Sequence, residues 1–294
     1  AISSLDSNKD SLRNTPFEKI ANVLNTTPKK VEFAKIKEFI SPKQIRNTRA
    51  TITTPPSNAI AGNGPFIKVS WNDGLPYNQL MEQNCSDNWL WDYRYPISSV
   101  VIATAEIMSF YKPSIYVDGT RIDWDYLCEK EEIHDTSDYF GSYTKDPDDK
   151  SLMIAKLMKF IGEQCGVKYQ CNSSTVNFSN VIKFLKKYGI YVDNMQKMNI
   201  ATLKASVDEL RPVFMYGQTS TGAGHWWIVD GYRTQPTTRA SFFPGFNVYM
   251  HANMGKGKSY SGYYLVDSNG GLTFDTTFAN FNTNLKMYPN VRND

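Results

Sequence analysis

The sequence has few of the residues on which metal and redox sites depend. It contains four cysteines and three histidines among 294 residues, and no two cysteines form a Cys-x-x-Cys pair. These are too few and too scattered for a zinc site, and no cluster implies an organic cofactor. Of the four cysteines, Cys165 and Cys171 could pair locally in an oxidising compartment. We favour free buried thiols, because cysteine is among the most often buried residue types.

Strong charge and long apolar runs are also missing. The formal net charge of +3 is too small to argue for nucleic acid or an anionic membrane surface as a partner. No apolar run approaches the ~20 residues that a membrane span needs. No charged-then-apolar leader is visible at Ala1, so export would require a leader that this sequence leaves out.

The chain divides by composition near residue 64. Residues 1–64 contain no Trp or Tyr and are rich in Lys, Thr, Asn and Pro. A Thr-Pro-x-Glu capping pattern predicts a helix over 15–24, and an apolar set over 31–40 predicts a strand or short helix. We interpret 1–64 as an N-terminal arm or propeptide remnant, and 65–294 as a globular domain.

The globular part begins with helical patterns and ends with strand patterns. Ile67, Val69 and Trp71 alternate as in a strand. Helix-length patterns follow at 98–110, 151–161, 178–185 and 201–210. After Pro212 come four short β-branched and aromatic runs, VFMYG, HWWIVDGY, FNVYMHAN and SGYYLVD, which predict an antiparallel sheet or barrel. The sequence therefore indicates an α+β fold.

Three segments, in order, carry a resemblance to a known family. They are Trp-Asn-Asp-Gly-Leu-Pro-Tyr-Asn at 71–78, Ser-Val-Val-Ile-Ala-Thr-Ala-Glu-Ile-Met at 99–108, and Gly-His-Trp-Trp-Ile-Val-Asp-Gly-Tyr at 224–232 with His-Ala-Asn-Met-Gly-Lys-Gly at 251–257. Their order and spacing resemble the streptopain family of papain-like cysteine peptidases. The resemblance covers about residues 66–288 and implies a helical left subdomain, an antiparallel β-rich right subdomain and a peptide-binding cleft between them.

The resemblance also implies the positions of the site residues. The nucleophile falls on Ser99, the general base on His225, the His-orienting amide on Asn253 and the oxyanion donor on Asp73. The family mechanism needs a thiolate at a helix N-terminus, where the helix dipole and a nearby imidazolium lower the thiol pKa. Serine is far less acidic and would have to lose its proton during attack.

The substitution of the oxyanion donor weakens the expected site further. Loss of one such donor costs about 2.7–4 kcal/mol in the transition state. A carboxylate at Asp73 is worse, because two like charges at 4 Å repel by about 4 kcal/mol at an effective dielectric of 20. Met254 and Lys256 also replace the family's tryptophans. The sequence therefore predicts an impaired, secreted or cell-surface (or periplasmic) peptidase homologue that binds peptide or protein, most simply as a monomer.

Other interpretations stay open at this level. The chain could be an active cysteine endopeptidase whose nucleophile was changed to serine, or a weak serine-nucleophile hydrolase. A laboratory substitution would alter one residue, whereas Ser98 and Asp73 depart from the family as well, so we favour natural loss. A further hypothesis is that Asp73 and Lys256 face each other across the cleft and form an ion pair. His251 is predicted to be structural.

Overall fold

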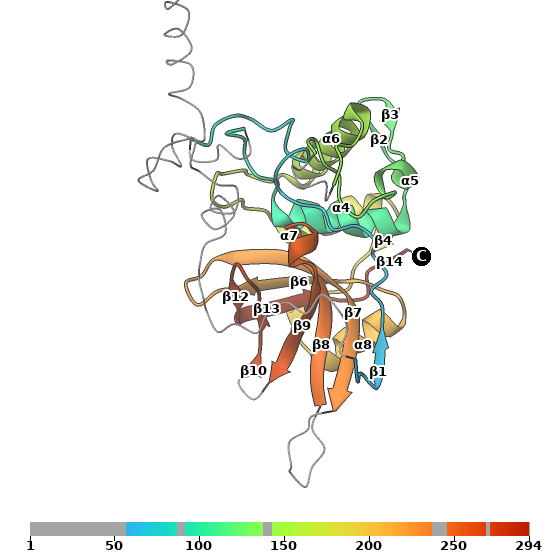
Figure 1. Cartoon of the computed structure of the whole chain (residues 1–294), viewed down its shortest axis with the longest axis vertical. Helices are drawn as coiled ribbons and strands as arrows, with labels where there is room; N and C mark the ends of the chain where they lie inside the picture. Colours follow the sequence, from blue (N-terminus) through green and yellow to red (C-terminus); the bar gives the residue numbers. More distant parts are fainter. Residues whose placement is uncertain (1–56, 87–91, 138–142, 237–245, 269–270, 294) are drawn as a thin grey trace, which may run out of the picture. The chain divides into compact units, whose positions relative to one another are not determined.

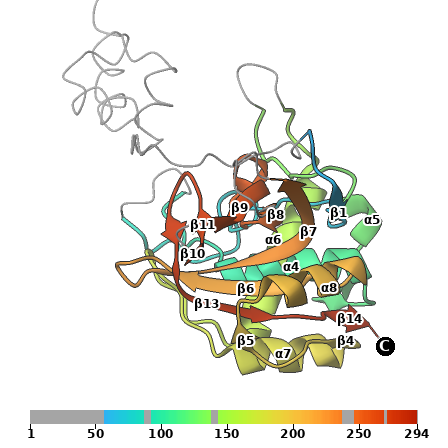
Figure 2. The same ribbon diagram turned by 90° about the horizontal axis from the view of Figure 1, so that it is seen from below.

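The computed structural model describes five stretches of the chain, which are 57–86, 92–137, 143–236, 246–268 and 271–293. The helix predicted over 15–24 and the apolar set over 31–40 lie outside the described residues. Figures 1 and 2 show the described part from two directions.

Helices dominate its first half and strands its second. The helices are α4 (Ser99–Tyr111), α5 (Trp124–Leu127), α6 (Asp148–Cys165), α7 (Phe178–Lys187), α8 (Ile200–Asp208) and the 3-10 helix η3 (Lys258–Tyr260). The longer strands are β6 (Val213–Gln218), β7 (Gly224–Pro236), β8 (Phe246–Asn253), β9 (Gly262–Ser268) and β13 (Thr283–Tyr288). The short strands are β1 (Ala61–Asn63), β2 (Tyr116–Val117), β3 (Thr120–Arg121), β4 (Ile190–Tyr191), β5 (Gln196–Lys197), β10 (Gly271–Leu272), β11 (Phe274–Asp275), β12 (Asn280–Phe281) and β14 (Arg292–Asn293).

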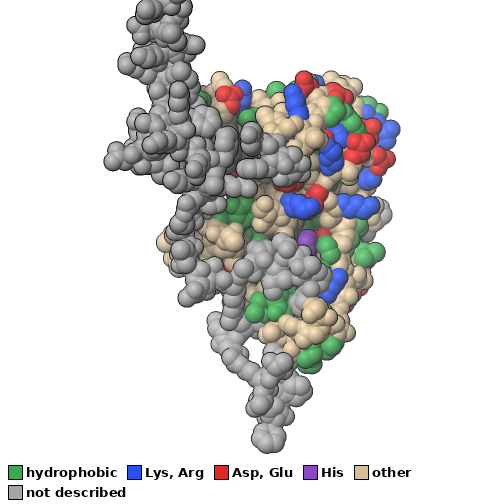
Figure 3. Space-filling view, in the orientation of Figure 1, with side chains coloured by type: hydrophobic (Ala, Val, Ile, Leu, Met, Phe, Trp, Pro, Cys, Tyr) green, Lys and Arg blue, Asp and Glu red, His purple; other side chains and the backbone are tan. Residues whose placement is uncertain are grey.

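The helical half is built around α4. Ten consecutive residues of this helix, from Val100 to Ser109, are buried, so it is a core helix packed on all sides rather than an amphipathic surface helix. One side packs on α6 and another on β7. Acidic and basic side chains intermix on the surface near α5 and α6 (Figure 3), as expected from the small net charge.

The predicted helices are present, with shifted ends. The pattern over 151–161 becomes α6, which is longer because Asp148 and Asp149 occupy its first turn, where carboxylates favour the positive helix end. It ends at Gly166, whose φ of 67° is the left-handed conformation that glycine adopts readily.

The large sheet is antiparallel throughout, in the order β10-β9-β8-β7-β6-β13-β5, with β1 added against β7. The four predicted strand runs appear in it as β6, β7, β8 and β9. Buried side chains of β6, β7, β8 and β13 form a second core together with α8, beneath the sheet. The α+β, papain-like prediction is therefore confirmed. Strand β1 lies within the predicted arm and pairs with β7. The folded part of the chain therefore begins no later than Ala61.

The strand predicted around Ile67 to Trp71 is wrong. These side chains are buried, but the backbone has no regular strand partner. Several of its backbone groups bond to side chains instead: Ile67 N–H donates to Asp230 (2.8 Å), and Trp71 N–H to Glu106 (2.8 Å). The burial of Ile67, Val69 and Trp71 therefore arises here without a β-ladder.

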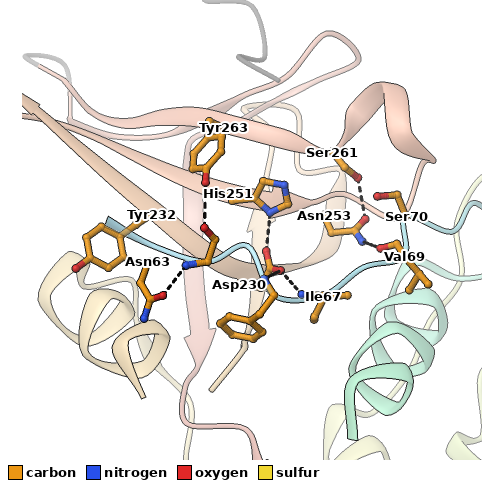
Figure 4. A network of polar contacts seen from close by, with 12 residues as sticks. Asn63, Ile67, Val69, Ser70, Asp230, Tyr232, His251, Asn253, Ser261 and Tyr263 are labelled. Atoms are coloured by element: carbon orange, nitrogen blue, oxygen red, sulfur yellow. Dashed lines mark hydrogen bonds and ion pairs between the residues drawn. The ribbon is translucent and has the colours of Figure 1, made fainter. Parts of the chain in front are cut away.

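The Asp230 carboxylate joins this segment to the sheet, as Figure 4 shows. It is fully buried, accepts the Ile67 amide and lies 2.6 Å from Nδ1 of His251. Arg233 donates to the carbonyls of Asn63 and Gly64 (2.9 and 2.8 Å). His251 thus takes part in a hydrogen-bond network near the C-terminal end of β8.

Candidate active site

A cleft of about 740 Å³ opens where α4 begins beside the sheet. Its walls come from the first turn of α4, the loop 170–176, the β6–β7 turn, the turn at 255–256 and one face of β13. Three of the four predicted site residues, Ser99, His225 and Asp73, line it.

Ser99 is the first residue of α4, after the extended Ser98. The Ser98 side chain makes no cap hydrogen bond. The Ser99 Oγ accepts a hydrogen bond from the backbone N–H of Trp226 (3.2 Å). This bond ties the positive end of the helix to β7, one residue beyond His225.

His225 is buried near the start of β7. Its Nε2 lies 2.7 Å from the carbonyl oxygen of Met254. A carbonyl only accepts hydrogen bonds, so Nε2 carries the proton and Nδ1 of the neutral ring is the basic nitrogen. Burial, together with the charge of Lys256, lowers the pKa of His225 from 6.5 to about 3. The ring is therefore neutral at physiological pH.

The Asn253 side chain does not orient His225 as the sequence analysis expected. Its Nδ2 donates to the Val69 carbonyl (2.6 Å), and its Oδ1 accepts from Ser261 (2.9 Å), as Figure 4 shows. The next residue, Met254, supplies the acceptor for the His225 ring through its backbone. Residue type could not reveal this, because any amino acid offers a backbone carbonyl.

Asp73 and Lys256 form an ion pair in the cleft, as the sequence analysis predicted. The Asp73 side chain is 11% exposed and that of Lys256 is 31% exposed. The carboxylate is compensated by an ammonium group that also lies close enough to disfavour protonation of His225. The position expected to donate a hydrogen bond to an oxyanion is thus occupied by an internally paired acid.

The cysteine pairing differs from the sequence-based expectation. Cys171, in the cleft wall, forms a disulfide with Cys85, whose Cα lies 5.4 Å away. Cys165 is a free, buried thiol at the end of α6, and Cys128 is free as well. The bond joins residues 86 positions apart, a proximity that only the tertiary fold creates.

The aromatic side chains that line the cleft were not predicted from the sequence. Tyr216, Trp226 and Tyr288 line it, and Phe178 stacks on the Trp226 ring with centroids 4.3 Å apart and planes 4° apart. The signal was present in the alternation of β6, β7 and β13, but the face of each strand that meets the cleft depends on sheet register.

Comparison with known proteins agrees with this geometry. The family model described as the peptidase C10 family matches residues 71–264. The chain belongs to the peptidase C10 family. This is the streptopain family of cysteine peptidases, so the resemblance seen in the sequence is confirmed.

Solved C10 structures show the same fold. Active wild-type interpain A cysteine protease of Prevotella intermedia matches with a TM-score of 0.51 and 18% identity, over 81% of this chain and 98% of that one. A mutant prointerpain A fragment from the same organism matches with a TM-score of 0.51 and 18% identity, over 96% and 86%. A search of curated proteins gives no match.

Two further features bear on this C10 chain. Within the described residues, no group of three or more His, Cys, Asp or Glu side chains is placed to hold a metal ion. No helix in the part of the chain that the structure describes is long and apolar enough to cross a bilayer.

Proposed function

We propose that this chain is a C10 peptidase homologue that binds peptide segments in its cleft and has lost most of the family's hydrolytic activity. The main support for this proposal is the serine at the nucleophile position. It lies at the start of α4, in the same cleft as His225. The absence of a thiol there removes the acidic nucleophile on which the family chemistry depends.

The state of His225 supports this proposal. A general base works best when its pKa lies near the operating pH, whereas burial and Lys256 hold the pKa of His225 at about 3. Such a ring is a weak base toward the Ser99 hydroxyl. It is equally unsuited to form the imidazolium that stabilises a thiolate.

The hydrogen bonding of Ser99 and Asp73 points the same way. The Ser99 Oγ accepts the Trp226 amide, which leaves its proton free to be donated to a bound carbonyl. Asp73 brings no donor to an oxyanion and is neutralised by Lys256. The groups present can hold a peptide by hydrogen bonding, but they supply little stabilisation for developing negative charge.

The disulfide supports a location outside the reducing cytosol. Structural disulfides persist mainly in oxidising compartments, and Cys85–Cys171 fixes a wall of the cleft. We therefore propose that the protein is secreted, at the cell surface or periplasmic.

Cleavage of casein by matched variants tests the proposal. We expect no measurable cleavage by the wild type, none by Ser99→Cys, and none by Ser99→Cys combined with Asp73→Gln, because the Lys256 charge and the weakly basic His225 remain in all three. Strong cleavage by Ser99→Cys alone would instead favour a recently lost nucleophile. Strong cleavage by the wild type would show a serine-nucleophile hydrolase. Titration of a labelled casein peptide against the wild type separates binding from catalysis.

A further inference from the structure

Four side chains form a row across the sheet that leads into the cleft. In the antiparallel pairs, Lys197 of β5 lies opposite Lys286 of β13, Lys286 opposite Tyr216 of β6, and Tyr216 opposite Trp226 of β7. Directly opposite residues share one face of a sheet. The row, here called the lysine–aromatic row, thus places two cations at one end and two aromatic rings at the other.

The two cations are unusual for a purely structural role. Like charges directly opposite one another destabilise a sheet. Lys197 is exposed and Lys286 half-buried, and within the described residues neither forms an ion pair. Among the described residues that line the cleft, Asp73 is the one acidic side chain, and Lys256 already pairs with it. No other described cleft residue therefore compensates the charge of Lys286.

Neighbouring rings hold the two aromatic side chains of the row in place. The rings of Tyr216 and Trp226 have centroids 4.9 Å apart. Phe178 supports Trp226 from one side by close stacking, and Tyr288 lies beside it with centroids 5.9 Å apart. Tyr216, Trp226 and Tyr288 are only partly buried, so part of their surface is available to a ligand. The same Trp226 bonds to Ser99 through its backbone.

We propose that the lysine–aromatic row selects acidic peptides, with ligand carboxylates at Lys197 and Lys286 and an aromatic or large apolar side chain against Tyr216 and Trp226. This inference rests on the proposed peptide-binding function and names its ligand class. Aromatic platforms bind apolar and aromatic side chains, and ammonium groups pair with carboxylates. An anion also relieves the repulsion between the two lysines.

Charge favours an acidic ligand over the chain's own residues 1–56 as the occupant of the row. Residues 1–56 carry ten Lys and Arg against five Asp and Glu. A segment with this excess of positive charge is repelled by the lysine pair. An acidic segment of another protein is the occupant that the row favours.

Two fluorescein-labelled peptides test the inference by fluorescence polarisation. The acidic probe is Gly-Glu-Glu-Trp-Glu-Glu-Gly, and the neutral probe has Gln in place of every Glu. Carboxylates flank the Trp on both sides, so either chain direction can reach the lysines. We compare wild type, Lys197→Met, Lys286→Met and the double variant. Lys204→Met is the matched control, because Lys204 lies on α8 over the Tyr232 ring, away from the cleft lining.

We expect the wild type to prefer the acidic probe. Each row-lysine variant should weaken binding of that probe by about two- to fivefold, the range for exposed ion pairs. The lysine substitutions should leave binding of the neutral probe unchanged. The Lys204→Met variant should bind both probes as the wild type does. Higher salt should reduce the preference, because exposed charges are screened.

Each other outcome has a distinct meaning. Equal binding of both probes, unaffected by the lysine variants, would overturn the acidic preference and leave peptide binding intact. Failure of both probes to bind would overturn both proposals. Melting temperatures of the single Lys→Met variants should match or exceed that of wild type, since repulsion is removed. A clear drop would show that the lysines serve the fold, and would count against the inference.

Discussion

The stability of the protein should fall steeply in mild acid because of one buried ring. An unfolded histidine gains a proton below pH 6.5, whereas folded His225 resists protonation until about pH 3. The stability that the neutral ring contributes is thus fully present above pH 6.5 and is lost as the pH falls toward 3. At pH 5 the gap from the unfolded pKa is 1.5 units, which at 1.36 kcal/mol per unit corresponds to about 2 kcal/mol.

Urea unfolding followed by Trp fluorescence measures this loss. The free energy of unfolding is obtained at pH 7 and pH 5 for wild type and for His225→Gln. We expect the wild type to lose about 2 kcal/mol more than the variant between these pH values. The double difference cancels contributions from the other titrating groups, as well as the direct cost of replacing the ring.

A second variant tests the cause. Lys256→Met removes a charge that lowers the pKa of His225, so the acid-induced loss should shrink, while Lys204→Met should leave it unchanged. NMR titration of the His225 ring protons gives the pKa directly. Equal acid losses in wild type and His225→Gln, or a ring that titrates near 6.5, would refute the reasoning. Such a result would also remove the main electrostatic support for impaired catalysis.

Two further predictions concern buried groups outside the reactive positions. Burial raises the pKa of Glu106 well above its usual value, so the wild type should lose stability as the pH rises through that pKa. Glu106→Gln keeps an oxygen for the Trp71 amide and should abolish the loss, measured as melting temperature from pH 5 to 9; an unchanged alkaline decline would contradict this. Cys85→Ser breaks the disulfide between residues 86 positions apart and should cost about 4.6 kcal/mol of unfolding free energy in urea. Cys128→Ser is the control with a free thiol, and comparable losses in both would argue against the disulfide.

Much of the fold could be predicted from local patterns. The apolar run beginning at Ser99 has helical length, and the run from Phe246 to Asn253 is rich in β-branched and aromatic residues. Each pattern matches the period of its element, which is why α4 and β8 appear where expected. The segment around Val69 misled the same reasoning, because side chains rather than a neighbouring strand bind its backbone.

The candidate site was predictable only in part. Ser99, His225 and Asp73 were placed by motif order, and charge complementarity correctly paired Asp73 with Lys256. The acceptor for His225 was missed, because it is the backbone carbonyl of Met254 and carries no residue-type signal.

The sequence by itself determined which elements form and which residue types stand at the motif positions, because both depend on neighbours along the chain. Only the tertiary structure decided that Cys171 bonds to Cys85 and that Lys197, Lys286, Tyr216 and Trp226 form one row. Those facts depend on strand register and on contacts between residues far apart in sequence. The burial that holds His225 neutral has the same origin, since a side chain loses its water only when distant segments pack around it.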